Sequence, residues 1–121
     1  MKTIKVSELS GASLDWAVAK CAGREWECAE NFLDYYDDGE MNYSTNWAQG
    51  GPIIEREMIQ LTPHCMFNPL HGWAAAFRSF DEDGDVDAPH RMRGKTPLIA
   101  AMRCYVASKF GDKVGVPEEL L

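Results

Sequence analysis

The clearest structural signal in the sequence is "TPLIAAMRCYVASKFG", residues 96–111 of a chain of 121 residues. Thr96 is a typical N-cap, Pro97 suits the first helical position, and Gly111 follows the last periodic residue. Lys109 lies in the last turn, where the helix dipole favours a cation. Between these ends the apolar side chains form one stripe: Leu98, Met102, Tyr105 and Val106, widened by Ile99 and Phe110. The pattern predicts a long helix that is buried along one side and anchors the fold.

The opening of the chain predicts a strand followed by a helix. "KTIKV" (2–6) alternates polar and apolar residues, as a short strand does. Ser10 as N-cap and Gly23 as terminator then bracket a run with helical spacing. Leu14, Val18 and Cys21 share one face of that run. We therefore expect a second main helix before residue 24.

The middle of the chain is less regular. Residues 24–46 mix aromatic with acidic side chains and predict short strands and loops. Residues 50–63 fit either a short helix beginning at Pro52 or a strand leaving a Gly-Gly turn, and both alternatives stay open. "GWAAAFRSF" (72–80) alternates like a strand, "DEDGDVDAP" (81–89) suggests a hairpin or loop, and "VGVPEELL" (114–121) a short extended piece and a tail. The predicted fold class is α+β, with two main helices packed on a small, mostly antiparallel β-sheet, in a single domain spanning residues 1–121.

Composition and charge exclude several classes of protein. Apolar residues make up 45% and charged residues 26%, which disfavours wholesale disorder. The net charge of −7 disfavours direct binding to a nucleic-acid backbone, because phosphate contacts need clustered Lys and Arg. No apolar run is long enough to span a membrane, and no leader opens the chain, so we expect a cytoplasmic protein. The four cysteines form no C-x-x-C pair and fit a reducing compartment: Cys21, Cys28, Cys65 and Cys104.

Four stretches together resemble a known family. They are "VSELSGASLDWAVAKCAG", "YSTNWAQGGPIIERE", "GWAAAF" and "TPLIAAMRCYVASKFGDKVGVPEEL", in the family's order and spacing. The chain resembles the NinX-like phage proteins, a family of small proteins of unknown function from temperate phages and prophages. The resemblance is weakest over residues 62–93. It implies a phage accessory protein that acts in the cytoplasm of the host bacterium, and it supplies no activity.

The predicted ligand site is the central stretch, residues 43–56. Two glycines let backbone N–H groups approach a ligand, and a helix that begins at Pro52 would aim free N–H groups at an anion. Aromatic rings there could stack on a planar ring, amides could bind its edge, and Arg56 could meet a phosphate. The predicted ligand-binding residues are Tyr43, Ser44, Thr45, Asn46, Trp47, Gln49, Gly50, Gly51, Pro52 and Arg56. The alternative also stays open: Trp47 and the isoleucines are core, and the glycines form a turn.

Other kinds of site find little support in the sequence. His64, Cys65, His71 and His90 lack the usual zinc spacings, so no metal is predicted. "DEDGDVD" is similar to a calcium loop but has Val86 where that loop needs glycine and Met92 where it needs a bidentate Glu. No catalytic or cofactor-binding motif is present, so we assign no catalytic residue and no cofactor, and we favour a binder over an enzyme.

Two functions follow from these observations. The first is a non-enzymatic binder of a small nucleotide-like ligand, by analogy with phage proteins that sequester host immune signals. The second is an interaction module that inhibits or redirects a host protein, with an acidic surface that steers it towards a basic partner. A homodimer is compatible with the four tryptophans.

Overall fold

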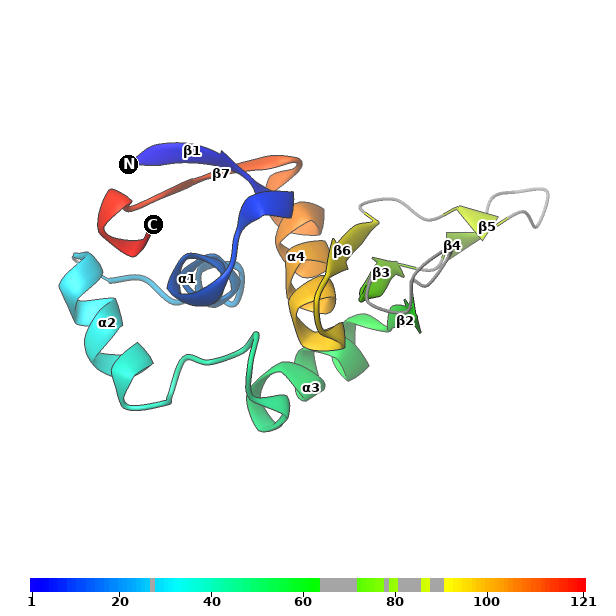
Figure 1. Cartoon of the computed structure of the whole chain (residues 1–121), viewed down its shortest axis with the longest axis horizontal. Coiled ribbons are helices and arrows are strands. Elements are labelled where there is room, and N and C mark those ends of the chain that lie inside the picture. The colour runs from blue at the N-terminus through cyan, green and yellow to red at the C-terminus, as the bar shows by residue number, and fades with distance from the viewer. Residues whose placement is uncertain (27, 64–71, 78, 81–85, 88–90) are drawn as a thin grey trace.

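The structure is a computed structural model of the chain and describes every residue except 27, 64–71, 78, 81–85 and 88–90 (Figure 1). Within the described residues it contains both helices and antiparallel strands, so the predicted α+β class is confirmed. In chain order the elements are β1 (Lys2–Lys5), the 3₁₀ helix η1 (Val6–Glu8), α1 (Gly11–Cys21), α2 (Ala29–Asp37), α3 (Trp47–Glu57), β2 (Ile59–Pro63), β3 (Trp73–Phe77), β4 (Ser79–Phe80), β5 (Val86–Asp87), β6 (Met92–Gly94), α4 (Pro97–Phe110), β7 (Lys113–Val116) and the 3₁₀ helix η2 (Glu118–Leu120).

Helix α4 is the centre of the molecule. The Thr96 hydroxyl oxygen accepts a hydrogen bond from the Ile99 backbone N–H at 3.1 Å, and Gly111 closes the helix at a φ of 84°. Both predicted ends are therefore confirmed. The prediction of a single buried side was wrong, because α1, α3, β3 and β6 contact the helix from different sides (Figure 1). Its small residues, such as Ala100 and Ala101, let these neighbours approach closely.

The strands form three separate sheets within the described residues, not the single sheet that the sequence predicted. The first and last strands, β1 and β7, pair antiparallel from Lys2 opposite Val116 to Lys5 opposite Lys113. The three-stranded sheet has the order β2-β3-β6 and is antiparallel throughout. Strands β4 and β5 form a short antiparallel pair of their own. The remainder of the predicted acidic loop, residues 81–85 and 88–89, lies outside the described residues.

Helix α2 contradicts the prediction of short strands and loops for residues 24–46. Ala29 and Phe32, three positions apart, are buried, while the acidic residues around them point to solvent. The Phe32 ring meets the Trp26 ring edge-on, with centroids 5.1 Å apart, and lies 5.9 Å from the Tyr36 ring. Aromatic packing on one narrow face therefore stabilises a helix whose other residues are mostly polar.

Helix α3 begins five residues earlier than the helix alternative predicted. The Asn46 side chain caps it by accepting a hydrogen bond from the Ala48 N–H at 2.9 Å, so Trp47 is the first helical residue. Pro52 lies inside the helix, where it has no N–H to donate to the Ala48 carbonyl. Ala48 is exposed, so water can satisfy that carbonyl. The strand alternative holds only beyond the helix, from Ile59 onwards.

Met58 ends α3 in a left-handed conformation, with φ 55° and ψ 46°, that costs a non-glycine residue about 1 kcal/mol or more. Its side chain is 80% exposed and contributes little packing. We expect Met58→Gly to raise the free energy of unfolding by about 0.5–1 kcal/mol, after the entropy cost of glycine is subtracted. Met58→Ala retains the Cβ atom and should change it little. Urea titrations of both variants measure the difference, and equal stabilities would contradict this account of the helix end.

Candidate functional site

A hollow of about 190 Å³ opens where α3 and α4 begin, and we call it the Trp47 hollow. Its lining combines the residues before α3, the start of α3 and the start of α4: Ser44, Thr45, Trp47, Thr96, Leu98 and Ile99. The first three of these are predicted ligand-binding residues. The structure thus brings part of the predicted site against a helix that lies about fifty residues further along the chain.

Trp47 forms one wall of the hollow. Its side chain is 54% exposed, which contradicts the alternative that it belongs to the core. The Cβ position of Gly51, one turn later, lies 3.8 Å from the Trp47 ring, so the indole lies along its own helix. Ile53, by contrast, is buried, as the core alternative expected of the isoleucines. An indole held in this way offers a planar apolar surface to a second ring.

Ser44 connects the hollow to a buried carboxyl group. Ser44 and Asp15 are 2% and 0% exposed, and the Ser44 N–H donates a hydrogen bond to Asp15 Oδ1 at 2.8 Å. Asp15 Oδ2 and Ser44 Oγ form no hydrogen bond with the described residues. Two unpaired oxygen atoms at one buried place are unusual, because each costs free energy when it is left unsatisfied.

Burial also perturbs the acidity of Asp15. Removal from water raises the pKa of its carboxyl group to about 6, and the nearby hydroxyl and backbone N–H of Ser44 oppose that rise. The hydroxyl lies near the carboxylate without regular hydrogen-bond geometry, so it can still rotate towards another partner. Buried acids with shifted pKa values cluster at functional sites, and this one is hydrogen-bonded to a residue that lines the hollow.

Three predicted site residues hold the surrounding loop. The Tyr43 hydroxyl donates to the Met41 sulfur at 3.4 Å. Asn46 uses its side-chain oxygen as the cap of α3. The Gln49 oxygen accepts a hydrogen bond from the Asn42 N–H at 2.6 Å, and its amide nitrogen donates to the Gly39 carbonyl oxygen. The polar atoms of Asn46 and Gln49 are therefore engaged with the chain itself.

Gly50, Pro52 and Arg56 lie away from the hollow's lining. Gly50 packs against the Tyr43 carbonyl and the Leu98 side chain. Arg56 is nine residues beyond Trp47, about 14 Å along the helix axis. Its guanidinium donates to the Tyr105 hydroxyl at 3.3 Å and lies 3.5 Å from the Glu57 carboxylate. The structure does not bring Arg56 and Trp47 to one place.

Two other hollows are prominent among the described residues. The larger of the two, about 630 Å³, lies beside α2 and is lined by Arg24, Glu25, Trp26, Asn31, Asp34, Tyr35 and Asp38. The second, about 420 Å³, is lined by Ser7, Arg91, Met92, Arg93, Gly94, Lys95 and Arg103, and we call it the basic hollow. Of the three, only the Trp47 hollow contains predicted site residues.

Several sequence alternatives fall on residues that the structure does not describe. His64, Cys65, His71 and His90 lie there, as do Asp81, Asp83 and Asp85. Among the residues that are described, no three His, Cys, Asp or Glu side chains lie close enough together to hold a metal ion. No helix in the described part of the chain is long and apolar enough to cross a membrane.

Comparison with known proteins identifies the family. A family model described as "Bacteriophage P22, NinX" matches residues 5–109, which is most of the chain. The chain belongs to this family. The resemblance found in the sequence is thereby confirmed, and membership supports a phage accessory protein. No curated protein matches the chain. The NinX match includes the lining of both the Trp47 hollow and the basic hollow, and it assigns no activity to either.

Several residues around the hollow are not recognisable as site residues from the sequence. Asp15 carries a signal, because it is an acid inside the apolar run "LDWAVA" (14–19) of a helix. Its partner Ser44 is 29 positions away, so the pairing itself is invisible in the sequence. Thr96 was predicted only as a helix cap, which it is. Its place in the hollow, with Leu98 and Ile99, depends on how α4 packs against α3.

Proposed function

We propose that this NinX protein is a non-enzymatic binder of a small nucleotide-like ligand, whose planar ring enters the Trp47 hollow. The observation that carries the proposal is the combination of a half-exposed indole with a buried serine hydroxyl that has no partner among the described residues. Ligand sites are typically mostly apolar with a few convergent polar groups. Leu98 and Ile99 supply the apolar wall here, and Ser44 supplies the polar floor.

The size of the hollow limits what it can hold. Its volume of about 190 Å³ is smaller than the roughly 300–1,000 Å³ of pockets that enclose a whole drug-sized ligand. A single ring such as a nucleobase matches that space, with the rest of the ligand outside it. Base–aromatic stacking contributes about 1–3 kcal/mol, so Trp47 supplies the main affinity.

The floor of the hollow favours a ligand that donates hydrogen bonds. The Ser44 hydroxyl is buried in this structure; once a small shift of the loop before α3 exposes it to the hollow, it can donate to the Asp15 carboxylate and accept from an N–H or O–H group of the ligand. An amino group on a base or a sugar hydroxyl has this chemistry. The contacts in the proposal are Ser44, Thr45 and Trp47, and Arg56 is not among them because it lies at the other end of α3. Binding of this kind in the host cytoplasm would sequester a nucleotide-like immune signal without turnover.

Ligand binding is tested by a thermal-shift screen against nucleosides, mononucleotides, cyclic dinucleotides and ADP-ribose. A compound at 100 times its Kd stabilises the protein by about 2.7 kcal/mol, which raises Tm by several degrees. Trp47→Ala and Ser44→Ala should each weaken the Kd of a hit at least about tenfold, since stacking and a buried hydrogen bond are each lost. Phe110→Ala removes an aromatic side chain that is 39% exposed at the opposite end of α4, and should leave the Kd unchanged. Equal affinities for the Trp47 and Phe110 variants would overturn the proposal.

The competing function is a module that binds a host protein. It is favoured by two exposed apolar side chains at the two ends of α3, Trp47 and Met58. A protein interface along α3 should be weakened by Met58→Ala, because Met58 is 80% exposed, whereas ring binding should not. A flat ligand panel together with a host protein captured in a Met58-dependent way would decide for this function.

A further inference from the structure

The basic hollow concentrates cations in a chain of opposite overall charge. Four of the 12 Lys and Arg residues line it, although the net charge of the chain is −7. No Asp or Glu belongs to its lining among the described residues. Within that part of the chain, none of the four cations forms an ion pair with a carboxylate. Such a cluster sets up a local positive potential that an anion can neutralise.

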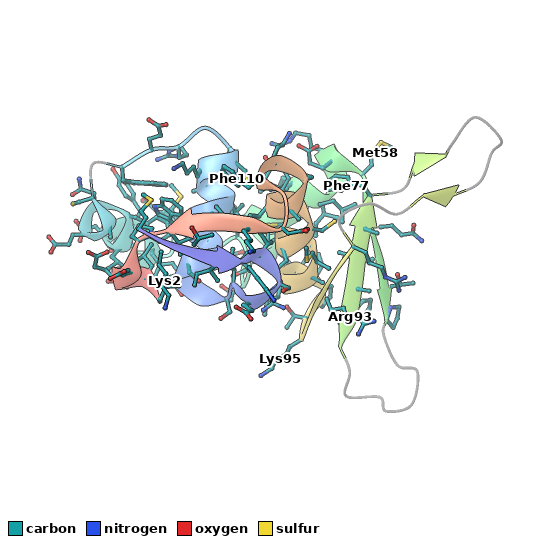
Figure 2. All side chains as sticks on the ribbon, turned by 90° about the horizontal axis from the view of Figure 1, so that it is seen from above. Lys2, Met58, Phe77, Arg93, Lys95 and Phe110 are labelled. Carbon is teal, nitrogen blue, oxygen red and sulfur yellow. The ribbon has the colours of Figure 1, made fainter. Side chains whose placement is uncertain are left out.

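The arrangement follows from the strand that carries three of the cations. Arg91, Arg93 and Lys95 alternate with Met92 and Gly94, so they lie on one face of the extended segment around β6. Gly94 faces α4, because a Cβ atom there would lie 2.6 Å from the Ala100 nitrogen. All three cationic side chains are exposed (Arg93 and Lys95 are labelled in Figure 2). Gly94 packs closely on α4, so the three cations extend from the other face of β6. The hollow lies along the edge of β6 that faces away from β3, where the Arg103 side chain reaches the Arg93 carbonyl from α4.

Arg103 supplies the fixed part of the hollow. Its Nε donates to the Leu9 carbonyl oxygen at 2.8 Å, and one terminal nitrogen donates to the Arg93 carbonyl oxygen at 2.7 Å. These bonds hold the guanidinium in one orientation and leave further N–H groups for a ligand. Burial lowers the pKa of Arg103, a sign that its charge is partly desolvated. The hollow also lies just before the first turn of α4, where the helix dipole favours negative charge.

We propose that the basic hollow binds a phosphate-bearing small molecule, through a diphosphate or similarly charged group. Guanidinium groups match phosphate oxygens in pairs, and three arginines with a lysine suit a group with several such oxygens. The volume of about 420 Å³ is large enough for a diphosphate and for part of the molecule that carries it. The proposal does not depend on ring binding in the Trp47 hollow, since the two linings share no residue.

The test is a calorimetric titration of the full-length protein with sodium pyrophosphate at low ionic strength. The variant Arg91→Gln/Arg93→Gln/Lys95→Gln removes three cations from the hollow. The matched control Lys2→Gln/Lys5→Gln/Lys113→Gln removes three exposed cations from β1 and β7, with the same change in net charge (Lys2 is labelled in Figure 2). We expect the first variant to weaken the pyrophosphate Kd at least tenfold and the second to change it less than about twofold. Both variants should unfold at midpoints close to the wild type.

Two outcomes would overturn the proposal. If pyrophosphate does not bind the wild-type protein, the hollow is not a phosphate site. If both triple variants lose affinity equally, the cations act only through net charge. A single-stranded oligonucleotide is titrated in parallel. Tight binding of the oligonucleotide without binding of pyrophosphate would mean that the hollow contacts a nucleic-acid backbone instead of a small molecule.

Discussion

Gly50→Ala is expected to destabilise the protein by at least about 2 kcal/mol, even though alanine is the better helix former. A Cβ atom at position 50 would lie 2.3 Å from the Tyr43 carbonyl oxygen and 2.6 Å from Leu98 Cδ2. A backbone oxygen cannot move aside as the end of a flexible side chain can, so α3 would have to shift away from the loop. Overpacking of this kind costs typically 1–3 kcal/mol and sometimes more.

The neighbouring glycine provides the matched control. A Cβ atom at Gly51 would lie 3.8 Å from the Trp47 ring, which is an ordinary van der Waals contact. Gly51→Ala should therefore raise the free energy of unfolding, by up to about 1 kcal/mol, through helix propensity alone. Urea unfolding of both variants measures a difference of about 3 kcal/mol between two identical substitutions in adjacent residues. Similar stabilities for the two variants would show that α3 does not pack closely against Tyr43 and Leu98 at Gly50.

The buried carboxyl group of Asp15 predicts an unusual dependence of stability on pH. Its pKa is about 6 in the folded protein, against an ordinary value of 3.8 for an aspartic acid, so the folded state binds the proton more tightly than the unfolded state. The free energy of unfolding therefore falls as the pH rises through this window, and it levels off above about pH 7. A shift of about two pKa units corresponds to roughly 3 kcal/mol, lost between about pH 4 and pH 7.

Asp15→Asn isolates this effect from other titrating groups. The Asn oxygen can still accept from the Ser44 N–H, and the amide can donate to the Ser44 hydroxyl. We expect the variant to match the wild type near pH 4 and to be up to about 3 kcal/mol more stable at pH 7.5. Asp34→Asn removes one acidic charge from the exposed face of α2 and serves as control. A stability difference between Asp15→Asn and the wild type that does not change with pH would contradict the buried ionisation of Asp15.

Local signals in the sequence predicted the helices that carry strong end markers. Thr96, Pro97 and Gly111 marked both ends of α4, and Gly23 has the positive φ expected after α1. The same signals failed for α2, because its apolar face is only a few residues wide between acidic neighbours. They also misplaced the start of α3. Proline is common at the first position of a helix, so Pro52 was predicted as the start, whereas the helix begins at Trp47 with Asn46 as its N-cap. Capping residues can be recognised from the local sequence. A helix with a narrow apolar face is stabilised mainly by its tertiary contacts, and these cannot be recognised from the local sequence.

The candidate site was predictable only as a segment. Residues 43–56 stood out by composition, but whether each side chain faces a ligand, a loop or the core depends on contacts with distant residues. Ser44 is hydrogen-bonded to Asp15 of α1, and Arg56 is hydrogen-bonded to Tyr105 of α4. Gly50 packs against Leu98, which is also in α4. These pairs are 29 to 49 positions apart. The two adjacent glycines have different roles that the sequence does not distinguish. Gly50 allows close packing against Tyr43 and Leu98, whereas Gly51 lies beside the Trp47 indole.

The most direct test of the Trp47 hollow as a ring-binding site is an NMR titration of the ¹⁵N-labelled protein. Nucleosides, mononucleotides, cyclic dinucleotides and ADP-ribose are added in turn, and the Trp47 indole N–H is followed together with the backbone amides of Ser44, Thr45 and Thr96. We expect a binding compound to shift these signals together and to leave those of α2 unchanged. Shifts centred instead on residues 24–38, around the hollow beside α2, or no shifts with any compound in the panel, would contradict ring binding in the Trp47 hollow.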